Sequence, residues 1–440
     1  MGRTRLQAPF LLGFLLVSPL LHAEAPRLRL TLQAALKTAL DQNPRVHQSL
    51  LALASSGEDR KMAAAALLPE VSAQAIGQRN KYNLDGLLGT PEPGGPVLVG
   101  PYTWGQANLE VRATLFDMST YKRWKASQHA ERSAQAQTRV VREEIAALVV
   151  GQYLRALRAD ASVKASQSRV ELADALEKLA QDQQKHGIGT RLDTLRSQVR
   201  LQSERQVLIQ AHTQALTSRA GLVKLLSLDP TTKIELSDTL ASPELPRLTF
   251  QETYDAGLRQ RPELLALDAR EKAAGAMRES ASSLRLPTLT ASGAYGSTVL
   301  RPENWANTYQ FTLGVRVPLF TGGLISARTA KAQFELDQVR SAKRDAQSQV
   351  GLEIQMARAE MEAARSEVEV ADLTVKLADE ALVQARHRFE AGVSNNIELI
   401  NAQDDLAKAN DNQISALYRL NQHRADLAKA TGQLESLFSR

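Results

Sequence analysis

The chain has no cysteine, and this absence removes several kinds of chemistry at once. Disulfide frameworks, thiolate nucleophiles and thiolate metal sites all require that residue. Basic and acidic residues nearly balance, with a formal net charge of +6 over 440 residues, and no dense block of Lys and Arg occurs. Nucleic-acid binding usually needs such a block, so no nucleic acid is expected as a partner.

Catalytic and cofactor motifs are missing as well. The histidines are dispersed, without a zinc-binding pair, and no glycine-rich loop ends in Lys followed by Ser or Thr. These are the patterns that hold zinc or cradle a phosphate. We therefore expect no enzymatic activity, no metal and no cofactor.

Long apolar runs are absent except near the N-terminus, where Arg3 and Arg5 precede an apolar run from Phe10 to Leu21. This order of charged, apolar and small residues is typical of a secretory signal, which we assign to residues 1–25. A membrane anchor is the alternative, but the run is shorter than the roughly 20 apolar residues that span a bilayer. No later segment is as apolar, so we expect no transmembrane helix after signal removal.

The first half of the chain recurs in the second half. Leu68-Pro69-Glu70-Val71 returns as Leu286-Pro287-Thr288-Leu289, and similar pairs recur along both halves. The period of roughly 200 residues is far longer than the units of about 20 to 50 residues found in solenoids. We predict two copies of one unit, residues 26–228 and 248–440, joined by an inter-repeat linker at residues 229–247.

Proline is missing from two long windows, residues 102–229 and 319–440. A proline inside a helix costs about 3 kcal/mol, so each window permits very long helices. Within each window the clearest break carries glycine, at residues 186–191 and 391–396. Each window is therefore predicted to hold a helix, a tight turn and a second helix.

The last of these helices shows how it packs. Leucine recurs there at a seven-residue spacing, and alanine recurs three residues further on. Such a pattern specifies a close-packed coiled coil, because small side chains let helix axes approach. The predicted helical hairpins span about residues 119–228 and 322–436. Helices alone leave a helical rod or bundle open as an alternative.

Each copy also contains a predicted strand hairpin, at about residues 69–118 and 286–321. Apolar residues occupy alternate positions there, as they do from Tyr309 to Leu319. Each strand therefore has one apolar face and one polar face, and the polar faces carry Arg112 and Arg316. In a soluble sandwich the apolar face would cover a core, whereas in an outer-membrane barrel it faces lipid and the polar face lines the lumen.

Three features favour the barrel. All three tryptophans and many other aromatics lie in or directly beside the strand hairpins, as in the aromatic girdles of membrane barrels. The first hairpin loop, Asn83 to Pro101, is longer than its counterpart, and the chain combines a signal with no spanning helix. Four strands cannot close a barrel in lipid, because open edges leave backbone groups unpaired. Several copies must therefore share one barrel.

The duplicated order of strand and helical hairpins resembles that of the TolC-type outer-membrane channels. The resemblance also rests on Val317-Pro318-Leu319-Phe320 followed by Gly322-Gly323, and on the segment from Phe389 to Gln403. It implies an α+β membrane protein whose homotrimer builds a 12-stranded barrel in the outer membrane of a Gram-negative bacterium. Long coiled-coil helices would continue this barrel as an α-barrel in the periplasm.

In that family the helical-hairpin tips form the periplasmic entrance and meet an adaptor, or membrane fusion, protein that is fixed to an inner-membrane transporter. The resemblance therefore assigns adaptor contact to eight tip residues: Gly187, Ile188, Gly189, Thr190, Gly392, Val393, Ser394 and Asn395. Ser394 stands where some members have a basic residue that locks the entrance.

Four residues are candidates for the constriction: Asp193, Glu398, Asn401 and Asp405. Asp193 and Glu398 match acidic entrance positions of the family, whereas Asn401 stands where a second acid often occurs. Rings of carboxylates would favour cations. The alternative for Asp193 and Glu398 is a purely structural role in the first turn of a helix, where the macrodipole stabilises a carboxylate. Asp405 has an outward salt bridge as its alternative.

The function that follows is passive, adaptor-dependent export through an outer-membrane duct energised by the inner-membrane transporter. Drugs, metal ions and secreted polypeptides all stay open as cargo, because one wide conduit serves all of them. The competing interpretation is a periplasmic coiled-coil adaptor or scaffold with no channel of its own. Such a protein should lack the lipid-suited strand hairpins, and this chain has two.

Overall fold

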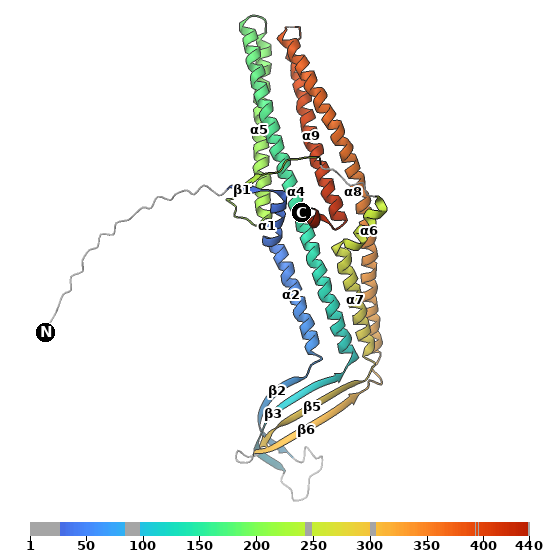
Figure 1. Ribbon diagram of the computed structural model, residues 1–440. Helices are drawn as coiled ribbons and strands as arrows, with labels where there is room; N and C mark the ends of the chain where they lie inside the picture. The colour runs from blue at the N-terminus through green and yellow to red at the C-terminus, as the bar shows by residue number, and fades with distance from the viewer. Residues whose placement is uncertain are drawn as a thin grey trace, which may run out of the picture.

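Figure 1 shows the computed structural model of the chain. The structure describes residues 27–83, 97–242, 249–299, 305–391, 393–394 and 396–438. The predicted signal and most of the first hairpin loop lie outside the described residues, as do Gly392 and Asn395. The described part is long and narrow, with a curved sheet at one end and two helical-hairpin tips at the other.

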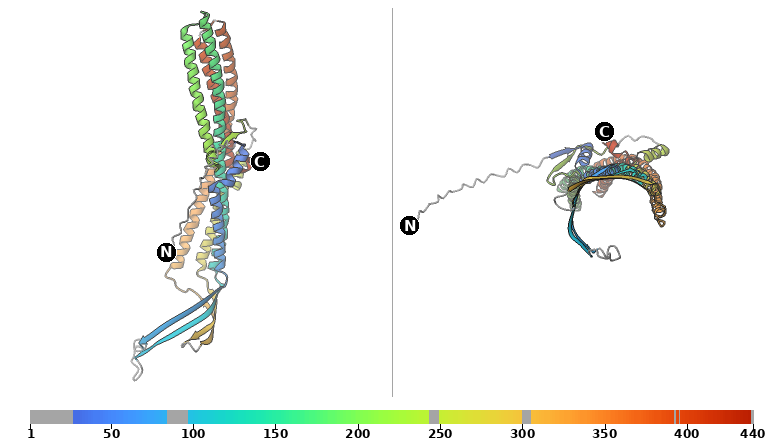
Figure 2. Two further views of the ribbon diagram at one scale, coloured as in Figure 1. Left: turned by 90° about the vertical axis from the view of Figure 1, so that its left-hand side faces the viewer. Right: turned by 90° about the horizontal axis from the view of Figure 1, so that it is seen from below.

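Four antiparallel strands form the main sheet: β2 (Glu70–Asn83), β3 (Leu98–Phe116), β5 (Thr288–Val299) and β6 (Trp305–Arg316). Their spatial order is β2-β3-β5-β6, so the two strand hairpins lie side by side. Seen along the long axis, the sheet curves into an arc (Figure 2). Within the described residues, its edge strands β2 and β6 each pair on one side only.

The strand register aligns the apolar positions of all four strands on one face. One row across the sheet joins Val71, Val111, Gly293 and Phe311. Large side chains on this face stay exposed, with 74% of the surface of Phe311 and 85% of that of Tyr309 accessible. A soluble sandwich would bury such a face under a second layer.

The helices repeat in length from one half to the other. The long helices α4 (Met118–Lys185) and α8 (Leu324–Glu390) have 68 and 67 residues, and each returns through a 35-residue helix, α5 (Arg191–Leu225) or α9 (Asn396–Ala430). At 1.5 Å per residue, α4 is roughly 100 Å long. Among the described helices, none has the length and apolar character needed to cross a bilayer.

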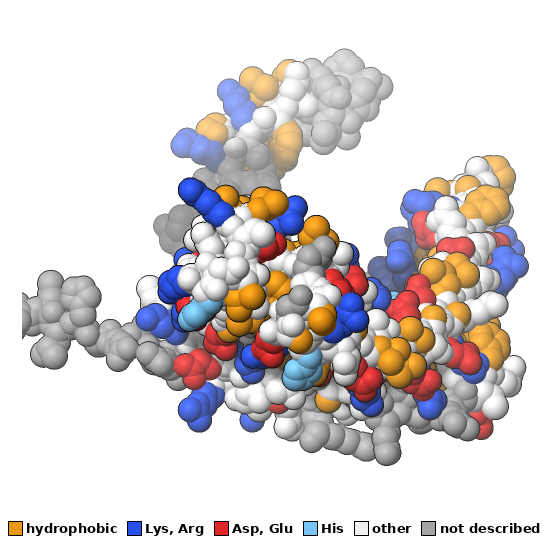
Figure 3. Space-filling view, turned by 90° about the horizontal axis from the view of Figure 1, so that it is seen from above, with side chains coloured by type: hydrophobic (Ala, Val, Ile, Leu, Met, Phe, Trp, Pro, Cys, Tyr) orange, Lys and Arg blue, Asp and Glu red, His pale blue; other side chains and the backbone are white. Residues whose placement is uncertain are grey.

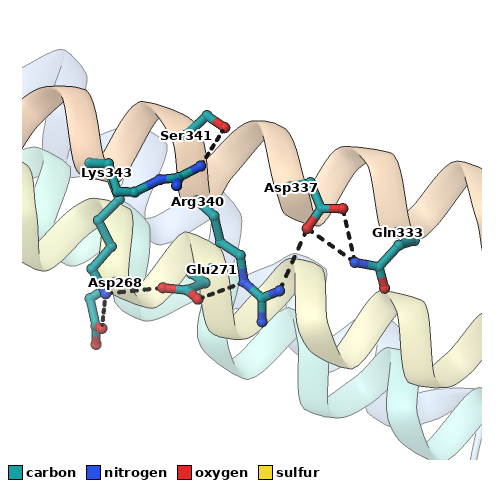
Figure 4. A network of polar contacts seen from close by, with 8 residues as sticks. Asp268, Glu271, Gln333, Asp337, Arg340, Ser341 and Lys343 are labelled. Carbon is teal, nitrogen blue, oxygen red and sulfur yellow. Dashed lines mark hydrogen bonds and ion pairs between the residues drawn. The ribbon is translucent and has the colours of Figure 1, made fainter.

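Four shorter helices complete the two halves: α1 (Leu32–Gln42) and α2 (Pro44–Ala65) in the first, α6 (Phe250–Gln260) and α7 (Pro262–Ser283) in the second. In both halves a proline opens the second helix, at the position where its missing N–H costs nothing. Polar contacts hold α7 against α8 (Figure 4): Lys343 lies 2.9 Å from Asp268 and 3.0 Å from Glu271, and Arg340 lies 3.1 Å from Glu271.

The largest core lies halfway along the molecule, where α1 and the short helix α10 (Leu434–Phe438) pack on α4. At its centre lies the fully buried Tyr153, whose single hydroxyl hydrogen is shared between two acceptors, the carbonyl of Leu30 at 2.9 Å and the carboxylate of Asp238 at 2.8 Å. Burial is the main cause that raises the pKa of Tyr153, and the hydrogen bond with Asp238 raises this pKa further. Tyr153 thereby joins Leu30, near the start of the described residues, to Asp238 in the connection between the two halves.

That connection is more structured than a plain linker. It contains the strand β4 (Lys233–Leu236), which pairs in parallel with β1 (Arg27–Leu30). The sequence analysis predicted neither strand, because each has only four residues. Leu30 and Ile234 enter the central core from this small sheet.

Beneath α10, the carboxylate of Glu143 is enclosed by other charged groups. One of its oxygens accepts the backbone N–H of Glu435 at 3.4 Å, and the other is buried without a hydrogen-bond partner among the described residues. Arg142 pairs with the side chain of Glu435. Burial raises the pKa of Glu143 to about 7, and the carboxylates of Glu435 and Glu263 push this pKa in the same direction.

The raised pKa predicts a pH-dependent stability. Because the native state holds the Glu143 proton more tightly than the unfolded state, ionisation destabilises the fold as the pH rises from about 4.5 to about 7. Glu143→Gln removes this ionisation. We expect the variant to gain thermal stability over the parent protein at pH 8 and to gain much less at pH 5, by circular dichroism in detergent. The neighbouring exposed Glu144→Gln is the control, and an equal difference at both pH values for Glu143→Gln would contradict the prediction.

Candidate functional site

The tip of the first helical hairpin depends on two glycines. Gly187 has a positive φ of 76°, a conformation that other residues adopt only at a cost in strain. A Cβ atom on Gly189 would come within 3.0 Å of the Gln183 Cβ and 3.1 Å of the Gln184 nitrogen. The chain can therefore reverse tightly between α4 and α5.

Asp193 lies in the first turn of α5 and is engaged locally. Its carboxylate accepts the backbone N–H of Thr190 at 3.2 Å and the Thr190 hydroxyl at 2.5 Å, while the Thr190 Oγ1 accepts the N–H of Asp193 at 3.2 Å. This reciprocal arrangement is a capping box. Asp193 therefore caps the start of α5.

The second tip is described only in part, because Gly392 and Asn395 lie outside the described residues. Val393 is 69% exposed and Ser394 is half-buried. Glu398, in the first turn of α9, forms an ion pair with Arg388 of α8 at 3.0 Å. This contact spans the turn and joins the two helices of the hairpin.

Asn401 lies three residues after Glu398, and Asp405 lies four residues after Asn401, so the three side chains share one face of α9. All three are exposed. Asp405 lies 3.8 Å from Lys408, which is the outward salt bridge that the sequence offered as its alternative. The four candidate constriction residues therefore do not converge on one point within a single copy of the chain.

Asn396, at the start of α9, was not among the tip residues predicted from the sequence. Its side chain is buried, and its amide donates hydrogen bonds to the carbonyl of Asp193, at 2.9 Å, and to the Ser197 hydroxyl, at 3.1 Å. These partners are about 200 residues away in sequence and belong to the other hairpin. Asn396 therefore fastens the second tip to the first.

A second connection between the hairpins lies further from the tips. Arg169 of α4 contacts Glu204 of α5 at 3.4 Å and Asp411 of α9 at 3.0 Å. Arg200 of α5 contacts Glu204 at 2.7 Å and also pairs with Asp404 of α9. Arg169 and Glu204 are nearly buried, with side chains 13% and 8% exposed. This ion network holds three helices together.

Both tips carry exposed apolar side chains. Figure 3 looks down on them and shows a curved, hollowed outline with apolar groups among charged ones. Ile188 is 77% exposed, and the following Leu192 is 54% exposed. On the second tip, Val393 and Ile397 are exposed as well. Exposed apolar side chains rimmed by charge are typical of surfaces that bind another protein.

At the other end of the molecule, Arg112 and Arg316 lie on the polar face of the sheet. Arg112 is paired in register with Glu70, and its guanidinium lies 2.5 Å from Glu110. Arg316 is paired in register with Thr288. Both arginines are exposed and far from the hairpin tips. Among the described residues, no group of His, Asp and Glu is placed to hold a metal ion.

Comparison with known proteins assigns the family. The model of the outer membrane efflux protein family matches residues 35–227 and 253–433, one segment in each half. The chain belongs to this family. The assignment confirms the resemblance to the outer-membrane family and the outer-membrane localisation, and it favours an outer membrane efflux protein over a periplasmic adaptor or scaffold.

Individual relatives are more distant. The protein CyaE of Bordetella pertussis is 27% identical over 315 residues, which cover 70% of this chain and 66% of CyaE. The outer membrane efflux protein BepC of Brucella suis is 24% identical over 56% of this chain and 54% of its own length. The chain thus spans just under two thirds of the first relative and about half of the second.

Solved structures establish the same fold. The outer membrane protein VceC of Vibrio cholerae aligns with a TM-score of 0.80 over 91% of this chain and 96% of its own, at 17% sequence identity. At that identity the likeness concerns the fold alone. A mostly helical protomer with a small curved sheet is therefore shared with a known outer-membrane protein.

The position of Asn396 yields a prediction about the tips. Asn396→Ala leaves the Asp193 carbonyl and the Ser197 hydroxyl without their partner, so we expect a loss of about 1 to 3 kcal/mol in the free energy of unfolding. Hydrogen exchange should also become faster in residues 186–197. Asn401→Ala, at an exposed position of the same helix, is the control. Equal stability and equal exchange for both variants would show that Asn396 does not fasten the tips.

Proposed function

We propose that this chain is one third of a homotrimeric export channel, with a 12-stranded barrel in the outer membrane and a helical barrel in the periplasm. The observation that carries the proposal is the sheet with two open edges and an exposed apolar face. In hydrocarbon each unpaired backbone group costs several kcal/mol, so these edges need partners. Other copies of the same arc supply them.

The direction of the strands suits this closure. The strands alternate in direction from β2 to β6, so the two edge strands run opposite ways. When β6 of one copy meets β2 of the next, the new pair is antiparallel like the others. The apolar face then turns to lipid and the polar face, with Arg112 and Arg316, lines the lumen.

The helices have open edges of the same kind. α5 and α8 are the outer helices of the two hairpins and carry exposed apolar side chains along their length: Leu195, Val199, Ile209 and Leu216 on α5, and Leu352, Met356, Val370, Leu373 and Leu377 on α8. Exposed apolar stripes on long helices favour packing against another helix. Packing α5 on α8 of the next copy would close the helical barrel.

The exposed apolar tips support a contact with a periplasmic adaptor protein, which would connect the duct to an inner-membrane transporter. Residues 1–25 would direct the chain to the periplasm as a secretory signal, and residues 26–228 and 248–440 would be the two structural repeats. The channel itself is passive, and the transporter supplies the energy and selects the cargo. The entrance would be lined by Asp193, Glu398, Asn401 and Asp405.

The orientation of the sheet gives a test with two adjacent residues of β6. Phe311→Arg places a charge on the apolar face near the middle of the strand, which costs about 2 to 4 kcal/mol in a membrane barrel. We expect this variant to lose the unheated trimer band in gel electrophoresis and to leave the outer-membrane fraction.

Gln310→Arg introduces the same charge on the polar face and is the matched control. We expect it to assemble like the parent protein, because its side chain faces water. Normal assembly of Phe311→Arg, or equal failure of both variants, would rule out a lipid-facing apolar face.

The entrance assignment is tested by planar-bilayer conductance. Glu398→Gln removes one carboxylate from each copy, so we expect the ratio of cation to anion permeability to fall about twofold or more. Glu58→Gln, at an exposed site on α2 far from the tips, is the control. An unchanged reversal potential in Glu398→Gln would remove this residue from the selectivity filter.

A further inference from the structure

The first turns of α4 carry a lysine whose surroundings differ from those of the other lysines nearby. The Lys125 ammonium lies 4.9 Å from the centre of the Trp124 ring and 5.8 Å from that of Tyr121. Such cation–π contacts hold the ammonium in place without neutralising it. In the described part of the chain, Lys125 has no carboxylate partner.

Two polar atoms close to Lys125 are also left without partners. The indole nitrogen of Trp124 and the Nδ1 atom of His129 are buried and form no hydrogen bond with any described residue. Buried polar groups are nearly always paired, so two such atoms within two turns of one helix indicate a missing partner. Burial lowers the pKa of His129, and the positive charges of Arg132, Lys272 and Lys125 lower it further.

Lys125 and His129 line a groove between α4 and α7 with a volume of about 560 Å³. The acids of this groove already have partners: Glu279 pairs with Lys122 at 2.7 Å, Asp268 with Lys272 at 2.7 Å, and Glu271 with Arg340 at 3.1 Å (Figure 4). The groove therefore offers an excess positive charge at Lys125. An anion fits this arrangement.

The groove lies on the convex side of the molecule. Lys125 precedes Val150, which lies in the central core with residues of α1 and α10, by about seven helical turns, so it shares the face of Val150 on α4. The short elements packed there lie outside the arc (Figure 2). Convex side chains at this height face the surroundings of the barrel and not its lumen.

The groove also lies next to the membrane. β3 ends at Phe116 and Lys125 follows nine residues later, at roughly 13 Å along the axis of α4. Helical side chains point back toward the N-terminus of their helix, here toward the sheet. The Lys125 ammonium is therefore at the height of the headgroup layer, which is roughly 5 to 8 Å thick.

From this juxtaposition we propose that the groove between α4 and α7 binds the phosphate of a glycerophospholipid in the periplasmic leaflet of the outer membrane. The Lys125 ammonium forms an ion pair with the phosphate, and His129, which also lines the groove, donates a ring N–H group to a phosphate oxygen. The proposal rests on the outer-membrane localisation and on the proposed barrel, but not on conduction or on any adaptor.

The test is a titration of the purified full-length protein in dodecyl maltoside with dihexanoylphosphatidylglycerol, followed by isothermal calorimetry. Loss of a charged hydrogen bond in Lys125→Gln should weaken binding about tenfold. His129→Phe keeps an aromatic ring and removes the N–H group, and it should weaken binding about fivefold. Circular dichroism and unheated gel migration report whether each variant is folded and assembled.

Lys331→Gln is the matched control. Lys331 is the eighth residue of α8, as Lys125 is the eighth residue of α4, and the Lys331 side chain is exposed. Its affinity should stay within about twofold of the parent protein. Equal affinities of Lys125→Gln and the parent protein would overturn the site. Inorganic phosphate binding as tightly as the lipid would overturn the lipid assignment, and neither outcome depends on whether the channel conducts.

Discussion

Unpaired backbone groups at a strand edge cannot remain in hydrocarbon, and the rest of this structure follows from that constraint. Each open N–H or C=O group costs several kcal/mol in the bilayer core. The sheet has one such edge at β2 and another at β6 within the described residues, and its exposed apolar face suits lipid. The proposed barrel meets this constraint with copies of the chain around an axis, and its long helices would follow the same circle as the strands.

The duplication allows one chain to keep four elements side by side along its whole length. Below the central core the row is α2, α4, α7 and α8, and above it the row is α5, α4, α9 and α8. The two long helices run through both levels, while shorter helices replace one another beside them. Because α5 and α9 are equal in length, as are α2 and α7, the shorter helices of the two halves end at matching heights along the molecule. At the central core, α2 and α7 are replaced by α5 and α9 as neighbours of the long helices. The buried Tyr153 and its partners stabilise this region.

Local patterns predicted much of this architecture and little of the candidate site. Alternation from Tyr309 to Leu319 and the proline-free windows depend on near neighbours, so the strand and helical hairpins are visible in the sequence. The Thr190 to Asp193 spacing likewise shows a helix start. By contrast, the bond of Asn396 to the Asp193 carbonyl and the ion network of Arg169 join residues about 200 positions apart. No local pattern marks such pairs, and β1 and β4 are too short for periodicity to show.

The distribution of buried contacts also bears on how the entrance can widen. Within one copy, the two hairpins are joined by Asn396 at the tips and by the ion pairs of Arg169 with Asp411 and of Arg200 with Asp404 further along. Breaking the hydrogen bonds of the buried Asn396 costs about 1 to 3 kcal/mol, whereas ion pairs with an exposed partner contribute about 0 to 1 kcal/mol each. These contacts together oppose separation of the two hairpins, so the hairpins of one copy are expected to move as a unit in any widening of the proposed entrance.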